Sequence, residues 1–365
     1  MATITLDNVE KKFGEAYAVK PLNMTINSGE FVVLLGPSGC GKTTTLRMIS
    51  GLEAVTSGSI RFDDKDVTWL HPSQRDIAFV FQFFALYSHM TARQNIAFPL
   101  QAAGLPKAEV ATRVEEVAAM LRIGPLLDTR PGSLSGGDQQ RVALARALVR
   151  HPAAFLMDEP LGALDAEFRE TMRAEIKRLH IQQNATTVYV THDQVEAMAM
   201  GDKIVIMSRA EVQQAGTPAE VYYDPSNLFV ARFIGSPGMN LIEGQYSSGA
   251  VQLPGGNVYA VPEQWHKAIE AGLPENGKVI IGFRPESAVV SLEGAMSSVV
   301  YADDLHGGYS MLHLELPDSS IVHARVGREF SYPIGTPLQF DIDPQMVRFF
   351  NPVTERALRL HGGEA

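Results

Sequence analysis

The sequence is poor in three features that would place it in other classes of protein. It has one cysteine among 365 residues, Cys40, which excludes an internal disulfide and fits a reducing compartment. No apolar run approaches the roughly 18–20 residues that span a bilayer, so we expect no membrane crossing. The first residues, MATITLDNVEKKF, contain no apolar h-region, and we therefore expect no secretory signal peptide.

Basic charge is also scarce. The chain carries 31 Lys and Arg against 41 Asp and Glu, which gives a formal net charge of -10. This balance argues against a broad electrostatic surface for nucleic acid. A hydrophobic content of 45% is ordinary for a globular protein with buried cores. The length predicts two domains, at roughly 100–200 residues for each.

The pattern of the chain changes after residue 235. Before it, apolar runs at 31–35, 77–81, 154–157, 187–190 and 203–207 predict buried strands that alternate with helical stretches. Such alternation is typical of an α/β core with a largely parallel sheet. Residues 91–150 are mostly helical and would form a subdomain inserted into the core. Residues 239–350 contain short strand-like runs between turns, which favours a small all-β barrel or sandwich. We predict domains at 1–235 and 236–365.

One segment matches a phosphate-binding loop at every fixed position of G-x-x-x-x-G-K-[ST]. It follows the apolar run 31–35, and a helix is expected to begin near Lys42. Its glycines let backbone N–H groups turn towards phosphates, and the helix directs its positive end at them. Lys42 would reach the β- and γ-phosphates, and the Thr43 hydroxyl would bind Mg²⁺. The predicted ATP-binding residues here are Gly36, Pro37, Ser38, Gly39, Cys40, Gly41, Lys42, Thr43 and Thr44.

Two further segments carry candidate chemistry. Asp158 and Glu159 follow the buried run 155–157, where α/β sheets place their ligands, and Asp158 would hold Mg²⁺. The alternative is a pair of solvated acids at a strand end. Residues 134–141, LSGGDQQR, begin a helix and supply a second phosphate-binding surface. Two such surfaces in one chain suggest that ATP is held between two copies of the protein.

The phosphate-binding loop together with LSGG resembles the ABC ATPases. The resemblance implies that Glu159 is the catalytic base, that His192 contacts the γ-phosphate, and that Gln82 senses both metal and water. Phe13 would stack on adenine, although a core phenylalanine is the alternative. The signature residues of one copy would contact the ATP of the other. They are Ser135, Gly136, Gly137 and Asp138.

The sequence departs from the family pattern at two places. Asp138 stands where a glutamine is commoner, and its carboxylate would either repel nucleotide or cap the helix. In the segment 161–165, LGALD, relatives often carry Ser-Asn before the Leu-Asp pair, which Leu164 and Asp165 retain.

Four segments are similar to the importer ATPases of the maltose and glycerol-phosphate type: 83–90, 191–198, 233–240 and 282–286. This resemblance implies a homodimer beneath two membrane-spanning permease subunits, served indirectly by an extracytoplasmic solute-binding protein. The chain would lie peripherally at the cytoplasmic face of the plasma membrane. Its tail would be an OB-like domain that makes dimer contacts or binds regulators. The expected cargo is a sugar, a polyol or a glycerol phosphate, with no nucleic-acid partner.

Three alternatives remain open from the sequence. ATPases that serve spermidine, sulfate or iron importers share most of these motifs, and the cargo is recognised by other subunits. A soluble ABC ATPase that acts on DNA or ribosomes is opposed by the single cassette, the acidic charge and the absence of zinc-type cysteines. A nucleotide-binding regulator without turnover is opposed by the presence of Glu159 and His192.

Overall fold

The computed structural model describes residues 2–291 and 293–360. They form two compact units that divide between Pro218 and Ala219, each with its own sheets and core. This division lies before the domain boundary at 235/236 that the sequence predicts, and the position of that boundary stays a prediction.

The first unit is built on a six-stranded sheet in which five strands are parallel. Its order is β10-β9-β3-β8-β7-β6, with β10 antiparallel to β9. Every residue of β3, β7 and β8 is buried, as expected for strands covered on both faces. The predicted parallel sheet is thereby confirmed. The bounds are β3 Phe31–Leu35, β6 Ile77–Val80, β7 Ala154–Asp158, β8 Thr187–Thr191, β9 Lys203–Ser208 and β10 Glu211–Gly216.

A second, antiparallel sheet of order β2-β1-β4-β5 packs with the first across a shared core. Its strands are β1 Ile4–Phe13, β2 Ala16–Ile26, β4 Ser57–Phe62 and β5 Lys65–Asp66. Helix α1, Lys42–Ser50, contributes Leu46, Met48 and Ile49 to that core. The loop between β3 and α1 is therefore held between two sheets.

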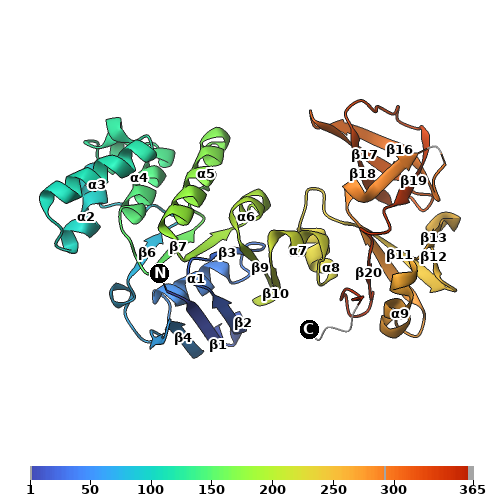
Figure 1. The fold of residues 1–365 in the computed structure, drawn as a ribbon, viewed down its shortest axis with the longest axis horizontal. Helices are drawn as coiled ribbons and strands as arrows, with labels where there is room; N and C mark the ends of the chain where they lie inside the picture. Colours follow the sequence, from blue (N-terminus) through green and yellow to red (C-terminus); the bar gives the residue numbers. More distant parts are fainter. Residues whose placement is uncertain (1, 292, 361–365) are drawn as a thin grey trace. The chain divides into compact units, whose positions relative to one another are not determined.

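Helices α2 (Ala92–Ala102), α3 (Lys107–Met120) and α4 (Gly136–Leu148) lie between β6 and β7 in sequence and gather beside the sheet (Figure 1). Thr91 begins α2 with a capping box, and Ser135 caps α4. Two more helices follow strands of the parallel sheet. Asp165 caps α5, Ala166–Gln183, and Asp193 caps α6, Gln194–Met200. These caps fix where each helix begins at the edge of the sheet.

The second unit contains two five-stranded antiparallel sheets. One has the order β13-β12-β11-β14-β20 and the other β15-β19-β16-β17-β18, and both contribute to one core. The first comprises β11 Asn240–Ser247, β12 Ala250–Gln252, β13 Val258–Ala260, β14 Lys278–Phe283 and β20 Arg348–Phe350. The second comprises β15 Ala288–Ser291, β16 Met296–Leu305, β17 Tyr309–Glu315, β18 Ile321–Gly327 and β19 Pro337–Ile342.

Three helices accompany these strands: α7 Pro218–Tyr223, α8 Leu228–Phe233 and α9 Glu263–Gly272. Helix α9 was not expected from the sequence; it buries Trp265 and Ile269, one turn apart, against the β-core. Arg284, only 1% exposed, joins α7 and α8 to the segment after β14 by donating to the carbonyls of Tyr222, Ala231 and Ile234.

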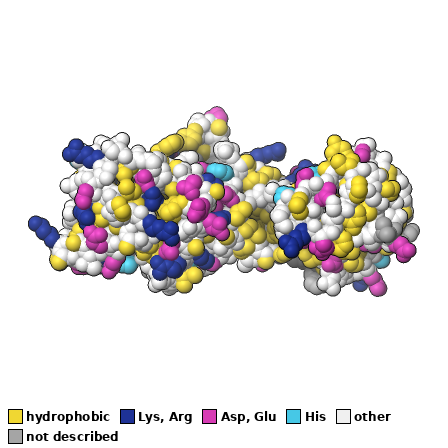
Figure 2. Space-filling model, turned by 90° about the horizontal axis from the view of Figure 1, so that it is seen from above, with side chains coloured by type: hydrophobic (Ala, Val, Ile, Leu, Met, Phe, Trp, Pro, Cys, Tyr) yellow, Lys and Arg dark blue, Asp and Glu magenta, His cyan; other side chains and the backbone are white. Residues whose placement is uncertain are grey.

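The surface carries charges of both signs. Acidic and basic side chains are interspersed on the face drawn in Figure 2. Among the described residues, none of the helices has the length and apolar character that crossing a bilayer requires.

Candidate nucleotide site

The loop between β3 and α1 has the shape of a phosphate cradle because its glycines allow close backbone approach. A Cβ on Gly36 would come within 2.2 Å of the Met207 carbonyl oxygen, and one on Gly41 within 2.5 Å of that of Ala18. Gly41 also has a φ of 108°, in the left-handed region that favours glycine, and it begins α1. Other residues at these positions would push the loop away from its two supporting strands.

The Lys42 side chain folds back over this loop. Its ammonium group donates to the carbonyl oxygens of Gly36 at 2.7 Å and of Pro37 at 2.9 Å, and lies 3.8 Å from the Cys40 Sγ. Lys42 is 6% exposed and Cys40 is 3% exposed. The loop thus holds a buried cation whose present partners are weak neutral acceptors. An anionic ligand would compete well for it.

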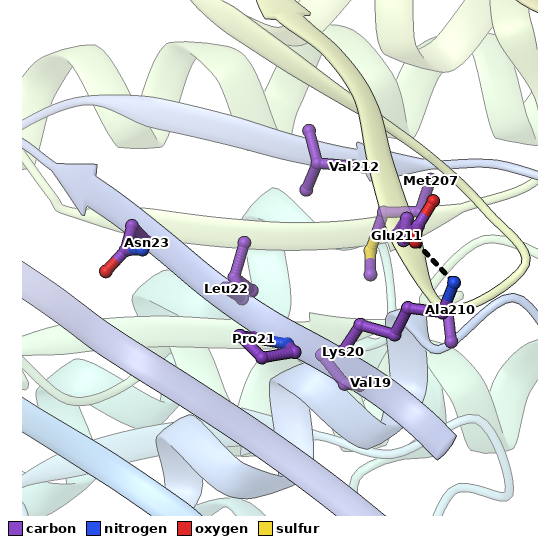
Figure 3. A pocket seen from close by; sticks show the side chains of 9 residues that line it. All are labelled: Val19, Lys20, Pro21, Leu22, Asn23, Met207, Ala210, Glu211 and Val212. Carbon is purple, nitrogen blue, oxygen red and sulfur yellow. Dashed lines mark hydrogen bonds and ion pairs between the residues drawn. The ribbon is translucent and has the colours of Figure 1, made fainter. Parts of the chain in front are cut away.

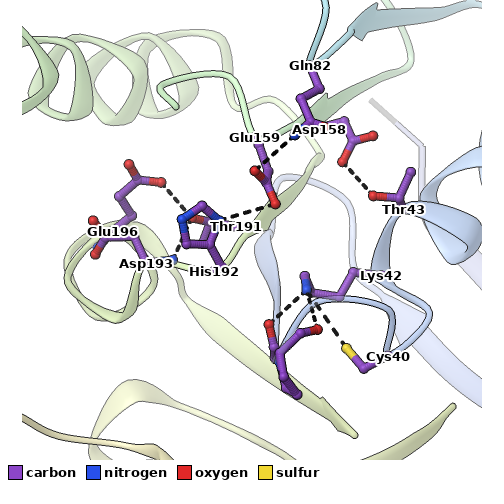
Figure 4. Close-up of polar contacts among 12 residues, drawn as sticks. Cys40, Lys42, Thr43, Gln82, Asp158, Glu159, Thr191, His192, Asp193 and Glu196 are labelled. Atoms are coloured by element: carbon purple, nitrogen blue, oxygen red, sulfur yellow. Dashed lines mark hydrogen bonds and ion pairs between the residues drawn. The ribbon is translucent and has the colours of Figure 1, made fainter. Parts of the chain in front are cut away.

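A hydroxyl and a carboxylate meet beside this cation (Figure 4). Thr43 Oγ1 donates to Asp158 Oδ1 at 2.9 Å. Burial raises the pKa of Asp158 above its ordinary value, although the hydrogen bond from Thr43 opposes the shift. A cation next to Asp158 would favour its ionised form, and hard oxygen donors of these two kinds suit Mg²⁺.

Glu159 lies at the centre of a second group of side chains (Figure 4). The Gln82 amide donates to Glu159 Oε2 at 3.3 Å, and His192 Nδ1 lies 3.2 Å from Glu159 Oε1. Glu159 has a φ of 46°, which is uncommon for a residue with a side chain and recurs at functional sites. Each of the two carboxylate oxygens therefore has one partner, and the three side chains come from separate segments.

The sequence assigned no role to the residues that support the group formed by Gln82, Glu159 and His192. The carboxylate of Glu196 accepts from the hydroxyls of Tyr189 at 2.9 Å and Thr191 at 2.8 Å. Thr191 Oγ1 in turn accepts from the Asp193 N–H at 3.0 Å, which fixes the backbone on both sides of His192. Burial raises the pKa of Glu196. The sequence signal for these residues was their place in the family-like segment 191–198, which assigned Thr191, Asp193 and Glu196 no individual role.

Gln140 was also missed. It is 2% exposed, donates to the Glu159 carbonyl oxygen at 3.4 Å and accepts from the Ala163 N–H at 3.0 Å. Its position on α4 links the signature helix to the turn that follows Glu159.

The signature segment begins α4 with Ser135 as its cap. Ser135 Oγ accepts from the Asp138 N–H at 3.1 Å, and Gly136 and Gly137 form the first turn. Asp138 is thus not the cap itself. In the part of the chain that the structure describes, the hydrogen bonds of Ser135 go to Asp138 and those of Lys42 stay within the P-loop, so a single copy does not bring the two predicted phosphate-binding surfaces together. Phe13, at the end of β1, is 56% exposed, with the Lys11 ammonium 4.9 Å from its ring centre.

The segment after Gln82 lines a groove of about 780 Å³ between β6, α2 and α4. Arg146 of α4 donates to the carbonyl oxygens of Ala85 at 2.8 Å and Phe84 at 3.0 Å. The Tyr87 ring packs on Phe98 with ring centres 4.9 Å apart. The partly buried guanidinium of Arg146 therefore holds the start of the segment 83–90, which contributes Ala85 and Tyr87 to the groove lining.

Another cavity, of about 410 Å³, lies between β2 and the β9–β10 hairpin (Figure 3). An ion pair between Lys20 and Glu211 crosses it. None of the sequence-predicted site residues lines this cavity, and we assign it no function.

The fold and the loop between β3 and α1 define a P-loop nucleotide-binding protein. Comparison with known proteins gives the family. The profile of the ABC transporter family matches residues 19–162, and that of the MalK OB fold domain matches residues 235–288. The chain belongs to the ABC transporter family, among the import ATP-binding proteins that carry a MalK-type OB domain.

Several curated proteins are similar over most of this chain. The sn-glycerol-3-phosphate import ATP-binding protein UgpC of Ruegeria sp. (strain TM1040) is 44% identical over 97% of this chain and 98% of its own length. The trehalose import ATP-binding protein SugC of Mycobacterium tuberculosis is 53% identical over 78% and 72%. The trehalose/maltose import ATP-binding protein MalK of Thermococcus litoralis is 47% identical over 90% and 89%.

Among solved structures, a dimeric ATP-binding cassette in a post-hydrolysis state, bound to ADP and Pi, covers 59% of this chain and 98% of its own. The two are 36% identical, with a TM-score of 0.55. The sequence-based predictions of family, fold class and ATPase type are confirmed.

Proposed function

We propose that this chain hydrolyses ATP as the paired motor subunit of an importer for a sugar, a polyol or a glycerol phosphate. The observation that carries the proposal is the grouping of Thr43 with Asp158 and of Gln82 and His192 with Glu159 next to the P-loop. The cargo class is supported by the relatives named for trehalose, maltose and glycerol-3-phosphate import.

In this proposal the P-loop amides and Lys42 bind the β- and γ-phosphates, and ATP replaces the loop carbonyls as the partner of Lys42. Phe13 stacks on adenine from the exposed end of β1. Thr43 and Asp158 would hold Mg²⁺, with Gln82 as a further candidate ligand. When bound, the ion would supply positive charge that offsets the negative charge of the phosphates during transfer.

Glu159 is proposed to accept a proton from the water that attacks the γ-phosphate. Gln82 and His192 hold one carboxylate oxygen each, which orients the base and leaves its remaining lone pairs for water. The signature residues Ser135, Gly136 and Gly137 of a second copy would complete the site over the γ-phosphate. ATP would then close the dimer, and hydrolysis would reopen it.

The groove lined by the segment 83–90 is proposed to receive a helix from each permease subunit. Its support is the set of aromatic side chains that line the groove, Phe79, Phe81, Tyr87 and Phe98, of which the last three are also exposed. Docking there would place the chain peripherally on the cytoplasmic face of the membrane. It would also connect a permease to Gln82, which precedes the groove-forming segment.

Phosphate release from Mg-ATP tests the ATPase half, with Lys42→Ala as the paired variant. The variant should lose nucleotide affinity, because the buried cation opposite the phosphates is removed. Unchanged affinity by calorimetry would refute the P-loop assignment. The importer half is tested in vesicles that contain the permease pair and its solute-binding protein, supplied with trehalose, maltose or glycerol-3-phosphate. Stimulation by DNA or ribosomes, with no uptake, would favour the soluble alternative.

A further inference from the structure

The hydroxyl group of Ser135 donates its hydrogen bond to a residue within the signature segment. Ser135 Oγ donates to Asp138 Oδ2 at 2.7 Å while it accepts from the Asp138 N–H at 3.1 Å. A serine hydroxyl has one proton to give. Here that proton points to a carboxylate on the same turn of α4.

Asp138 is itself held by a second partner. Its other oxygen, Oδ1, forms an ion pair with Arg141, and both side chains are largely buried. Arg141 is anchored from outside α4 as well, since it donates to the Arg122 carbonyl oxygen at 3.3 Å and lies 4.6 Å from the ring centre of Phe168. The carboxylate is therefore fixed in place and partly neutralised.

The backbone at Ser135 is fixed independently of this carboxylate. The Gln139 amide donates to the carbonyl oxygens of Pro131 and Leu134, both at 3.1 Å. The loop that leads into Ser135 is thus tied to α4 by a separate side chain. The Ser135 hydroxyl can therefore change its acceptor by rotation about the Cβ–Oγ bond alone.

The next step rests on the proposed function, in which Ser135 of one copy faces the γ-phosphate held by the other. We infer that Asp138 competes with that γ-phosphate for the hydroxyl proton of Ser135, and that Arg141 sets the strength of the competition. Asp138 is then a positioning residue for ATP-driven closure. While the Ser135 hydroxyl donates to Asp138, it presents only lone pairs to the phosphate.

The two neighbours of Ser135 should act in opposite directions. A neutral amide at 138 accepts the hydroxyl proton less strongly than a carboxylate does, and so releases Ser135 to phosphate. Removal of the cation at 141 leaves the Asp138 charge uncompensated and strengthens its hold on the hydroxyl. A purely structural role would make both changes destabilising and would make both weaken closure.

The experiment measures the concentration of Mg²⁺ and a non-hydrolysable ATP analogue at which half of the full-length protein is dimeric, by light scattering at fixed protein concentration. Because charge-assisted hydrogen bonds are roughly twice as strong as neutral ones, Asp138→Asn should lower this midpoint about three- to tenfold. Arg141→Gln should raise it by a similar factor, and Arg141→Lys should lie close to the native protein. Nucleotide affinity of the dilute monomer should be the same in all of them.

The control repeats Asp138→Asn in a Ser135→Ala background. If Asp138 acts through the hydroxyl, its substitution there should change the midpoint less than about twofold, because the shared partner is gone. An equal gain with and without Ser135 would mean that Asp138 repels phosphate directly, and would overturn the inference. Melting temperatures of all variants show whether Arg141→Gln is folded. If it is not, the dimerisation midpoints of Arg141→Lys and Asp138→Asn, measured separately, test the inference.

Failure of the inference and failure of the proposed function look different. A native protein that neither dimerises with the analogue nor releases phosphate from ATP would refute the function itself. A native protein that does both, with the same dimerisation midpoint as Asp138→Asn, would refute only the role of Asp138.

Discussion

Substitution of Glu159 by glutamine should nearly abolish ATP hydrolysis while ATP binding is retained. The two carboxylate oxygens lie 3.3 Å from Gln82 Nε2 and 3.2 Å from His192 Nδ1. A glutamine has the same shape and keeps one oxygen, so at least one of these contacts survives. What it loses is the ability to take a proton. Lys42, Thr43 and Asp158 make their contacts elsewhere and are untouched.

The expected effect follows from the role. A positioned general base contributes about 10²–10⁴-fold to a rate, which is about 3–5 kcal/mol of barrier. Glu159→Gln should therefore lower ATP turnover by about that factor while nucleotide affinity changes less than about threefold. With hydrolysis stopped, ATP itself should hold the dimer closed, which size-exclusion chromatography in saturating Mg-ATP would detect.

Glu170→Gln is the matched control, because it makes the same chemical change at an exposed position of α5. It should hydrolyse ATP at the native rate. A Glu159→Gln protein that also turns over at the native rate, or that remains monomeric in saturating ATP, would refute the assignment of Glu159 as base.

Two further predictions concern buried groups. Burial raises the pKa of Glu196 in the folded protein. Protonation of Glu196 therefore stabilises the folded state fully below the ordinary glutamate pKa, and this stabilisation is lost as pH rises through the raised pKa. Glu196→Gln should remove this loss, so that urea unfolding across about pH 4–8 shows the variant gaining on the native protein as pH rises; a constant difference would contradict this. Arg284→Met should cost about 3–5 kcal/mol, because the carbonyls of Tyr222, Ala231 and Ile234 lose a buried donor. Urea unfolding of the full chain measures it, with Arg284→Lys as the control that restores part of the loss, and a cost below about 1 kcal/mol would count against the contacts.

The sequence predicts most of the first unit because its signals are local. A parallel strand covered on both faces reads as a short apolar run, so 31–35 coincides with β3, and the runs at 154–157 and 187–190 fall within β7 and β8. The run 77–81 extends one residue past β6, since Phe81 is apolar but exposed and lies just after the end of the strand. The start of α4 was likewise readable, because the segment 134–141 was expected to begin a helix and α4 begins at Gly136.

Contacts between distant segments were not readable in this way. Gln140 is one glutamine among many until the fold brings it beside the carbonyl of Glu159. Arg284 was noticed only as part of a family-like segment. Its burial is explained by the carbonyls that accept its hydrogen bonds, which lie fifty or more residues away in sequence. Helix α9 was missed because its burial on a β-core is set by tertiary packing. Its local signals, Pro262 before the helix and Trp265 with Ile269, were short.

The place of Cys40 in the P-loop motif and its burial in the structure predict different reactivities of its thiol. Its place in the P-loop suggests a thiol that ATP covers. In the structure Cys40 is 3% exposed, and its Sγ lies against Gly36 and 3.8 Å from Lys42 Nζ, inside the loop. We therefore expect a thiol reagent to label nucleotide-free protein about a hundredfold more slowly than an exposed thiol, because the loop must open first. Ser38→Cys in a Cys40→Ala background provides the comparison, since Ser38 is exposed in the same loop. That variant should label rapidly and be protected by ATP, and equal rates for the two thiols without nucleotide would show that Cys40 is not packed inside the loop.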